Sequence, residues 1–465
     1  DDPDFNIDLH IHHIALPKPG NWKTLRKIAA QIFSEPLDQS RPLWSITFVE
    51  GLDNIPQVPK GSVAVISKIH HVVLDGMGGA NILGLLYDFT PETKPIPEPK
   101  PYIPKPMPNE LELVLKSTLS FVENPLKFPK LITETVVASV KAGMLTRGMK
   151  ADLPTAPFTA PPTPLNGIIS ARRMWNTSIL SLDRVKALKD IMKTTLNDVV
   201  LAICAGALRR YLLEKDKLPV KPLVAMVPIS TRTNKQAKKT EGNQISSMLV
   251  QLATNVEDPI ERLETIHENT VLGKTYQGAI GAKTLAKMAE AVPFGIANQA
   301  ARLYSRFHLS EMHNPVFNVT ITNVPGPQFP LYLNGHKLLS LMGMAPIIDG
   351  MGLIITVFSY NGLLTISSTS DEKTMPDIDL FSRYIRESAN ELEAVVLKYK
   401  DKKQKQKRVV KKAASDELFA HIRKQLKLNA QYIKPNNGLF QFVVTGEVPR
   451  TWRIDLNKSP GIVRK

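Results

Sequence analysis

The sequence has a single cysteine in 465 residues. No disulfide can form within the chain, which fits a protein of a reducing compartment. Cys204 lies in an apolar run over residues 199–208, with no side chain beside it that could act as a base. A reactive thiol needs such a neighbour, so the pattern favours a small residue of the hydrophobic core.

Long apolar runs are also absent. No stretch approaches the roughly 18–20 apolar residues that a membrane-spanning helix requires, and the acidic first residues do not form a signal peptide. The chain starts without methionine and in the middle of a regular pattern, which predicts a piece that lacks its original N-terminus. With 43% hydrophobic and 22% charged residues, it has the composition of a globular protein of two or three domains.

Acidic residues are outnumbered, since 59 Lys and Arg face 43 Asp and Glu, a net charge of +16. Residues 401–412 hold seven basic residues and one acidic residue, so the rest of the chain is still clearly basic. Such a balance suits nucleic acid, an anionic membrane surface or coenzyme A. Because aromatics are only 6% and no nucleic-acid-binding signature is present, we expect no nucleic-acid partner.

The strongest functional signal is His-His-Val-Val-Leu-Asp-Gly at residues 70–76. This motif follows an apolar, β-branched run over 62–69 and precedes Met-Gly-Gly-Ala, a pattern that predicts a strand, a tight turn and a helix. A histidine at such a junction can face a cleft, and imidazole suits proton abstraction near neutral pH. If the strand is regular, His70 and His71 point to opposite faces, one towards substrate and one towards structure.

Each of these residues also has a structural explanation. A histidine pair can simply end a strand, and Asp75 can cap the helix that follows. A second group of histidines, at positions 10, 12 and 13, lacks the Asp-Gly that would complete the same motif. It also lacks cysteine or acidic residues at metal-site spacing, so we expect no metal there.

Hydrophobic periodicity predicts helices and strands in alternation around a proline-rich middle segment. Helices are expected at residues 21–33, 80–89, 181–192, 195–213, 378–398 and 415–428. Strands are expected at 44–49, 62–69, 223–229, 244–252, 316–322, 352–360, 362–368, 439–445, 451–456 and 461–465, with a hairpin turn at Asn361-Gly362. Two apolar stripes in 110–149 predict a helix pair that packs on its own protein or, alternatively, lies on a membrane surface.

Joined to its surroundings, the motif resembles the bacterial-type wax ester synthase/diacylglycerol acyltransferase family, part of the coenzyme A-dependent acyltransferase superfamily. Further matches follow in the family's order: Pro-Leu-Trp at 42–44, Asn-Asp-Val-Val-Leu-Ala at 197–202, Val-Pro-Ile-Ser-Thr-Arg at 227–232, Gly-Asn at 242–243 and Asn-Val-Pro-Gly-Pro at 323–327. The resemblance covers roughly residues 1–398, and the family's first strand–helix unit is expected to be missing.

The resemblance implies a mixed α/β fold with two lobes, like that of chloramphenicol acetyltransferase, and an active site between the lobes. The N-terminal lobe would comprise residues 1–90 and the C-terminal lobe 168–398, joined by a proline-rich and helical segment at 91–167. A basic linker, 399–414, would follow. Residues 415–465 resemble the first half of a sterol carrier protein type 2 domain, a small α+β domain that holds lipid.

The family's activity implies an O-acyltransferase that moves a fatty acyl group from acyl-coenzyme A to diacylglycerol or a long-chain alcohol, giving triacylglycerol or wax ester. His71 would be the general base. His70 and Asp75 would complete the catalytic motif, Asp75 by pairing with an arginine, and Gly76 would let the backbone turn. Asn197 and Asp198 would support the site, although Asp198 also fits a capping box with Thr195.

The same resemblance implies acyl-coenzyme A as a co-substrate, with no metal and no tightly bound cofactor. It implies a cytoplasmic protein, attached peripherally to the inner face of the membrane or to lipid droplets. Two alternatives stay open: an acyltransferase or condensation enzyme with another donor or acceptor, and a lipid-binding surface protein without turnover. The pattern identifies no substrate-binding residues.

Overall fold

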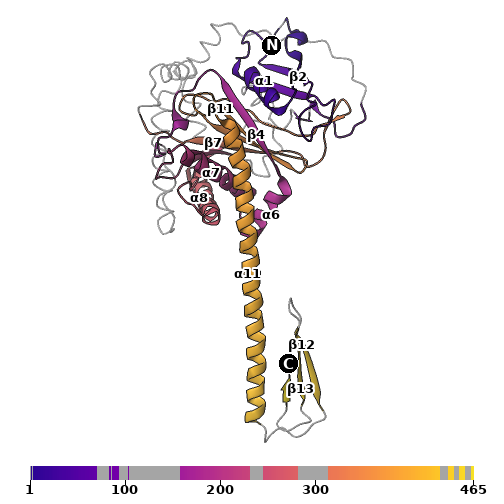
Figure 1. Ribbon diagram of the computed structural model, residues 1–465, viewed down its shortest axis with the longest axis vertical. Helices are drawn as coiled ribbons and strands as arrows, with labels where there is room; N and C mark the ends of the chain where they lie inside the picture. Colours follow the sequence, from indigo (N-terminus) through magenta and orange to yellow (C-terminus); the bar gives the residue numbers. More distant parts are fainter. Residues whose placement is uncertain are drawn as a thin grey trace. The chain divides into compact units, whose positions relative to one another are not determined.

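The computed structural model describes most of the chain outside the middle segment. The described residues are 2, 4–70, 83, 84, 86–93, 103, 158–230, 245–280, 313–429, 438–444, 450–455 and 462–464. Contacts divide the chain into two compact units, Asp1–Leu392 and Glu393–Lys465. Within the first unit, we call residues 4–70 the N-terminal lobe and the described residues of 158–392 the C-terminal lobe (Figure 1).

The N-terminal lobe is a three-stranded sheet with one long helix against it. Its elements are η1 (Ile7–Leu9), β1 (Ile11–Ala15), α1 (Trp22–Ser34), β2 (Trp44–Glu50) and β3 (Ala64–Ile69). Strand β1 pairs with β2 in parallel, and β2 pairs with β3 antiparallel. The predicted helix is confirmed, and Asn21 caps it because its side-chain oxygen accepts a hydrogen bond from the Thr24 N–H at 3.0 Å.

The C-terminal lobe contains a six-stranded mixed sheet in the order β4-β11-β10-β7-β5-β6. Its strands are β4 (Arg173–Ser181), β5 (Val224–Ser230), β6 (Ile245–Gln251), β7 (Val319–Pro325), β10 (Ile354–Tyr360) and β11 (Leu363–Asp371). Strand β7 is parallel to both β5 and β10, and the other pairs are antiparallel. A two-stranded ribbon, β8 (Tyr332–Leu333) with β9 (His336–Lys337), lies between β7 and β10 in the chain.

The core of this lobe is built around helix α7 (Leu196–Glu214), which packs against α6 (Leu182–Met192) and α8 (Pro259–Ile280). The residues from Val199 to Leu208 are all buried, so α7 is apolar around its whole circumference. No single described helix is long and apolar enough to span a membrane, although α6 and α7, bent by 104° to each other, pass that test as a pair on length and composition.

A tight hairpin joins the two central strands β10 and β11. Asn361 and Gly362 form its turn and both have a positive φ, 45° and 81°. These are the angles that a type I′ turn needs, and Asn-Gly is the pair that adopts them most readily. The hairpin predicted from these two residues is confirmed.

The final long helix corrects one prediction. Residues 378–398 and 415–428 were expected as two helices separated by a basic linker, 399–414. Instead, α11 (Ile378–Leu428) is one helix of 51 residues. The intervening segment contains no Gly or Pro, and its Lys, Gln, Arg and Ala residues are good helix formers.

The second unit takes its own small core from the end of α11 and a three-stranded sheet. Strands β12 (Leu439–Val444), β13 (Arg450–Asp455) and β14 (Ile462–Arg464) pair antiparallel in that order. Phe419 and Ile454 are buried together, with Ile422 and Leu426 packed against them. The three strands predicted here are confirmed, whereas the likeness to a sterol carrier domain stays a prediction.

Candidate functional site

The motif at 70–76 begins directly after β3, an edge strand of the three-stranded sheet. The predicted strand is confirmed as β3 (Ala64–Ile69), which pairs along its length with β2. Just beyond it, the His70 backbone N–H donates to the Leu43 carbonyl at 2.9 Å, and the His70 side chain is exposed. The Pro-Leu-Trp stretch at 42–44 thus supplies the carbonyl that fixes the start of the motif.

The two faces of β3 differ as strand alternation requires. Ala64 and Ile66 pack on the core beneath α1, whereas Val63 is 44% exposed. Lys68 lies on the same face of β3 as Ala64 and Ile66, towards α1. Its Nζ donates to the Ile32 carbonyl at 2.8 Å and also to the Glu35 carbonyl. His70 has the same parity as these residues, but it lies beyond the end of β3 and its side chain is exposed.

The rest of the motif lies outside the described residues. His71, Asp75 and Gly76 belong to this group, so the division of labour between the two histidines stays a prediction. The same holds for the helix pair expected in 110–149.

The chain after the motif is attached to the C-terminal lobe. Leu83, Gly84 and Leu86 are helical, as predicted, but the helix expected to reach residue 89 ends before Asp88. Asp88 instead forms an antiparallel bridge with Tyr332: the Asp88 N–H donates to the Tyr332 carbonyl at 2.7 Å and the reverse bond is 2.9 Å. Backbone pairing with another strand took precedence over local helix propensity.

The histidines upstream of the motif have separate structural contacts. His10 is buried, its ring lies 4.5 Å from that of Trp44, and its Nδ1 is 2.8 Å from the Trp44 carbonyl oxygen. His13 lies 3.1 Å from Glu50 on the neighbouring strand, with both side chains exposed. Across the described ranges, no group of three or more His, Cys, Asp or Glu side chains is arranged to hold a metal ion.

Asn197 and Asp198 begin α7, in the C-terminal lobe. Asn197 Oδ1 lies 3.5 Å from Asn323 Nδ2, so the Asn-Asp stretch and the Asn-Val-Pro-Gly-Pro stretch meet at one end of the sheet. Asp198 has no solvent-exposed surface. Its carboxylate accepts the Thr195 N–H at 2.9 Å and the Thr195 hydroxyl accepts the Asp198 N–H, so the predicted capping box is confirmed.

Two partners of Asp198 come from α8 and were not predicted. His267 Nδ1 lies 2.7 Å from Asp198 Oδ2, and the Thr270 hydroxyl lies 2.7 Å from Oδ1. Burial raises the pKa of Asp198, but the hydrogen bonds from Thr195, Thr270 and His267 outweigh it and hold the pKa below its ordinary value. The carboxylate is therefore ionised and fully engaged at neutral pH, and His267 Nδ1 carries the hydrogen.

Cys204 is confirmed as a core residue. It has no exposed surface, and burial raises the pKa of its thiol to about 12. Only the deprotonated thiolate is a nucleophile. Because Cys204 keeps its proton at neutral pH, it is not a nucleophile in the folded protein.

Comparison with known proteins identifies the family of the first unit. Residues 1–200 match the family model described as the wax ester synthase/diacylglycerol acyltransferase catalytic domain, and residues 241–393 match that of the WS/DGAT C-terminal domain. The chain belongs to the wax ester synthase/diacylglycerol acyltransferase family. The first match contains the whole motif together with Asn197 and Asp198, and the second contains His267 and Asn323.

Individual members of this family agree with that assignment. The chain is 35% identical over 378 residues to a Mycobacterium tuberculosis protein named as a candidate diacylglycerol O-acyltransferase, covering 81% of this chain and 72% of the relative. It is 30% identical over 407 residues to another protein of that organism named as a probable diacylglycerol O-acyltransferase, covering 85% and 83%.

A solved structure of the family shows the same fold. The Marinobacter aquaeolei wax ester synthase/diacylglycerol acyltransferase superposes with a TM-score of 0.60 at 26% identity, covering 85% of this chain and 82% of that one. The expected mixed α/β fold and the expected acyltransferase of the wax ester synthase/diacylglycerol acyltransferase family are both confirmed.

Proposed function

We propose that this acyltransferase moves a fatty acyl group from acyl-coenzyme A to the hydroxyl of diacylglycerol or a long-chain alcohol, with His71 as general base. The products are triacylglycerol or wax ester and free coenzyme A. The observation that carries the proposal is the His-His-Val-Val-Leu-Asp-Gly motif, attached to the end of β3 within the region that matches the family's catalytic domain.

The reaction proceeds by direct transfer. His71 accepts the hydroxyl proton as the oxygen attacks the thioester carbonyl, and a tetrahedral intermediate with a negatively charged oxygen forms. The intermediate collapses, the carbon–sulfur bond breaks, and the His71 imidazolium returns the proton to the departing thiolate of coenzyme A. The two substrates supply every reacting atom, so the chemistry requires neither a metal nor a bound cofactor.

The other motif residues support His71. His70 completes the catalytic motif next to His71, Asp75 pairs with an arginine to hold the loop, and Gly76 lets the backbone turn. Asn197 is the candidate oxyanion donor: its contact with Asn323 uses Oδ1, which leaves the amide nitrogen to donate. Asp198 does not touch substrate, because its carboxylate is enclosed by Thr195, His267 and Thr270.

The basic charge of the chain supports the choice of partners. A net charge of +16 favours the phosphates of coenzyme A and anionic lipid headgroups. We place the enzyme in the cytoplasm, attached peripherally to the inner face of the membrane or to lipid droplets, where its lipid acceptors are found.

A turnover assay tests the proposal. Radiolabelled palmitoyl-coenzyme A is offered with hexadecanol and diolein together, and labelled products are separated by thin-layer chromatography. His71→Ala lowers the rate of ester formation by about 10²–10⁴-fold, the usual contribution of a general base. His13→Ala, which removes an exposed histidine 3.1 Å from Glu50, serves as control and keeps the wild-type rate.

Both variants are compared with the wild type by circular dichroism, so that loss of fold is separated from loss of chemistry. A folded His71→Ala variant that makes ester at the wild-type rate would refute the assignment. Absence of any ester from the wild type with either acceptor would refute the proposed reaction itself.

A further inference from the structure

Helix α1 connects the two lobes of the first unit. Leu25 and Ile28 pack on the core of its own sheet. Its other side meets β4, where Ala29 and Ala30 form a buried cluster with Trp175. The rings of Trp22 and Trp175 lie 5.6 Å apart at the edge of this cluster. The helix therefore has two buried faces, one in each lobe.

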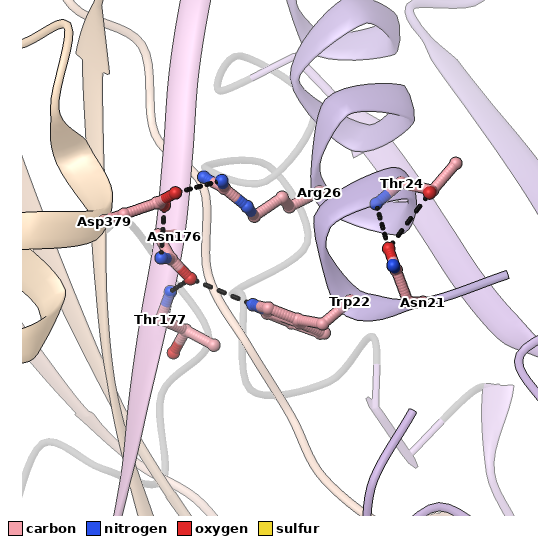
Figure 2. Close-up of polar contacts among 7 residues, drawn as sticks. All are labelled: Asn21, Trp22, Thr24, Arg26, Asn176, Thr177 and Asp379. Carbon is pink, nitrogen blue, oxygen red and sulfur yellow. Dashed lines mark hydrogen bonds and ion pairs between the residues drawn. The ribbon is translucent and has the colours of Figure 1, made fainter. Parts of the chain in front are cut away.

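A closed set of polar contacts lies beside this apolar cluster, and Figure 2 shows its members. Trp22 and Arg26 are four residues apart and share one side of α1. The Trp22 indole N–H donates to Asn176 Oδ1 at 3.0 Å, and Asn176 Nδ2 donates to Asp379 Oδ1 at 2.9 Å. Arg26 Nη2 completes the ring by pairing with Asp379 Oδ2. We call these four residues the lobe clamp.

The clamp is built to hold one arrangement. The Arg26 side chain is only 10% exposed, so its guanidinium depends on Asp379 for compensation. Asp379 lies in the first turn of α11, where the helix dipole favours a carboxylate. Asn176 is fixed by its place in β4, opposite Ser368 of β11. Each partner is thus held by a rigid element, and sliding α1 along the sheet would break all three contacts at once.

The clamp is linked to the motif from both sides. Upstream, Lys68 of β3 donates to the carbonyls of Ile32 and Glu35 at the end of α1, two residues before His70. Near that end, the Arg173 N–H of β4 donates to the Ser34 hydroxyl at 3.0 Å. Downstream of the motif, Asp88 is bridged to Tyr332 of the C-terminal lobe. The motif therefore lies in a stretch of chain tied to the C-terminal lobe before and after it.

We propose that Trp22, Arg26, Asn176 and Asp379 are positioning residues for acyl transfer, which hold the histidine motif of one lobe in register with the other lobe. The proposal rests on the proposed function for its catalytic readout. Charge compensation, hydrogen bonding and packing fix a single docking of α1 on β4. A misplacement of about 1 Å at a reacting group can lower the rate on the order of 10²-fold. Small changes in how α1 docks on β4 should therefore lower the rate of acyl transfer.

The test combines a distance with a rate. Cys204 is buried with a raised thiol pKa, so spin labels attach selectively to cysteines introduced at exposed Lys60 and Val220, one in each lobe. In the otherwise wild-type chain, pulsed electron–electron double resonance gives a single narrow distribution of the distance between the two labels. Arg26→Met, which keeps the aliphatic stem, broadens it and lowers kcat by roughly 10²-fold with little change in KM for acyl-coenzyme A.

Three further variants sharpen the test. Trp22→Phe keeps an aromatic side chain and leaves the Arg26–Asp379 pair in place, but removes the indole N–H donor and part of the ring, so it gives a smaller effect of the same kind. In Arg26→Lys combined with Asp379→Glu, the shorter lysine is compensated by the longer glutamate, so the ion pair can form again. This double variant recovers the narrow distribution of label distances and most of kcat. Arg172→Met, which removes an exposed arginine 3.5 Å from Glu372, is the matched control and changes neither readout.

An unchanged distance distribution in folded Arg26→Met would overturn the proposal, whatever the activity. A broadened distribution with wild-type kcat would also overturn it, since the docking would then not serve the reaction. Failure of the proposed function shows itself separately, as wild-type turnover by His71→Ala, and leaves the distance measurement intact.

Discussion

Replacing Asp198 by asparagine removes a buried negative charge without changing the shape of the side chain. In the wild type the carboxylate accepts three hydrogen bonds, from the Thr195 N–H and from the His267 and Thr270 side chains. Hydrogen bonds to a charged group contribute about 1 kcal/mol more than neutral ones. The loss of charge at three such bonds can therefore lower the free energy of unfolding by at most about 3 kcal/mol.

Two features of the site reduce that bound. Thr270 has a second acceptor, the His267 carbonyl at 2.9 Å, and the His267 side chain is 33% exposed and can turn to water. Asparagine also avoids the cost of burying a charge. We therefore expect Asp198→Asn to lower the free energy of unfolding by about 1.5 kcal/mol. Asp198→Ala, which also removes the Asp198 half of the capping box, should lower the free energy of unfolding by about 3 kcal/mol.

The measurement is urea denaturation of the full chain, followed by far-ultraviolet circular dichroism at several pH values. Because the folded state lowers the pKa of Asp198, its charge stabilises the fold fully above the unfolded value of about 3.9. That stabilisation is lost as the pH falls through the lowered pKa. The difference between wild type and Asp198→Asn is thus constant from pH 7 to about pH 5 and shrinks below about pH 4.

Equal stability of wild type and Asp198→Asn at pH 7 would refute the reasoning, because the charge would then contribute nothing. A difference that grows on acidification would refute the sign of the pKa shift. Asp183→Asn is the matched control: it removes a carboxylate from the first turn of α6, where the N-cap is Ser181. That change should alter the stability by only about 0.5 kcal/mol.

Three further predictions concern the fold. Cys204, whose thiol pKa is raised to about 12, should not react with Ellman's reagent at pH 8 until the protein is unfolded by denaturant. Gly362→Ala should lower the stability by about 1 kcal/mol in a denaturant titration, because φ is +81° there, while an added Cβ would meet no atom within 4 Å and so would add no clash. Gly326→Ala should cost more, about 2 kcal/mol, since a Cβ would meet the Ser359 carbonyl oxygen; equal losses at the two glycines would contradict this.

The elements that sequence predicted well have strong local signals. Helix α7 combines a capping box at Thr195 with an unbroken apolar run, and the β10–β11 hairpin has Asn-Gly at its turn. Such signals involve neighbouring residues only, and tertiary packing reinforces them. The prediction of β7 at 316–322 was displaced by three residues, to Val319–Pro325, because its end is set by pairing with β10.

Two of the longer elements of the C-terminal lobe were missed for different reasons. Strand β4 buries Asn176, Thr177 and Ser178 in succession, so it has no apolar–polar alternation to detect. Helix α8 has a cap that could have revealed it: Asp258 accepts the N–H groups of Ile260 and Glu261, and Pro259 is the first helical residue.

The amino-acid sequence by itself determined the family, the motif and its strand, and the helix starts, because each depends on residues close together in the chain. Only the tertiary structure decided which distant residues act together. His267 reaches Asp198 across 69 positions and Arg26 reaches Asp379 across 353, and neither pair leaves a trace in local periodicity. Burial is the physical reason, since a charge enclosed by a fold needs a partner, and the fold alone determines which side chain is near enough to be one.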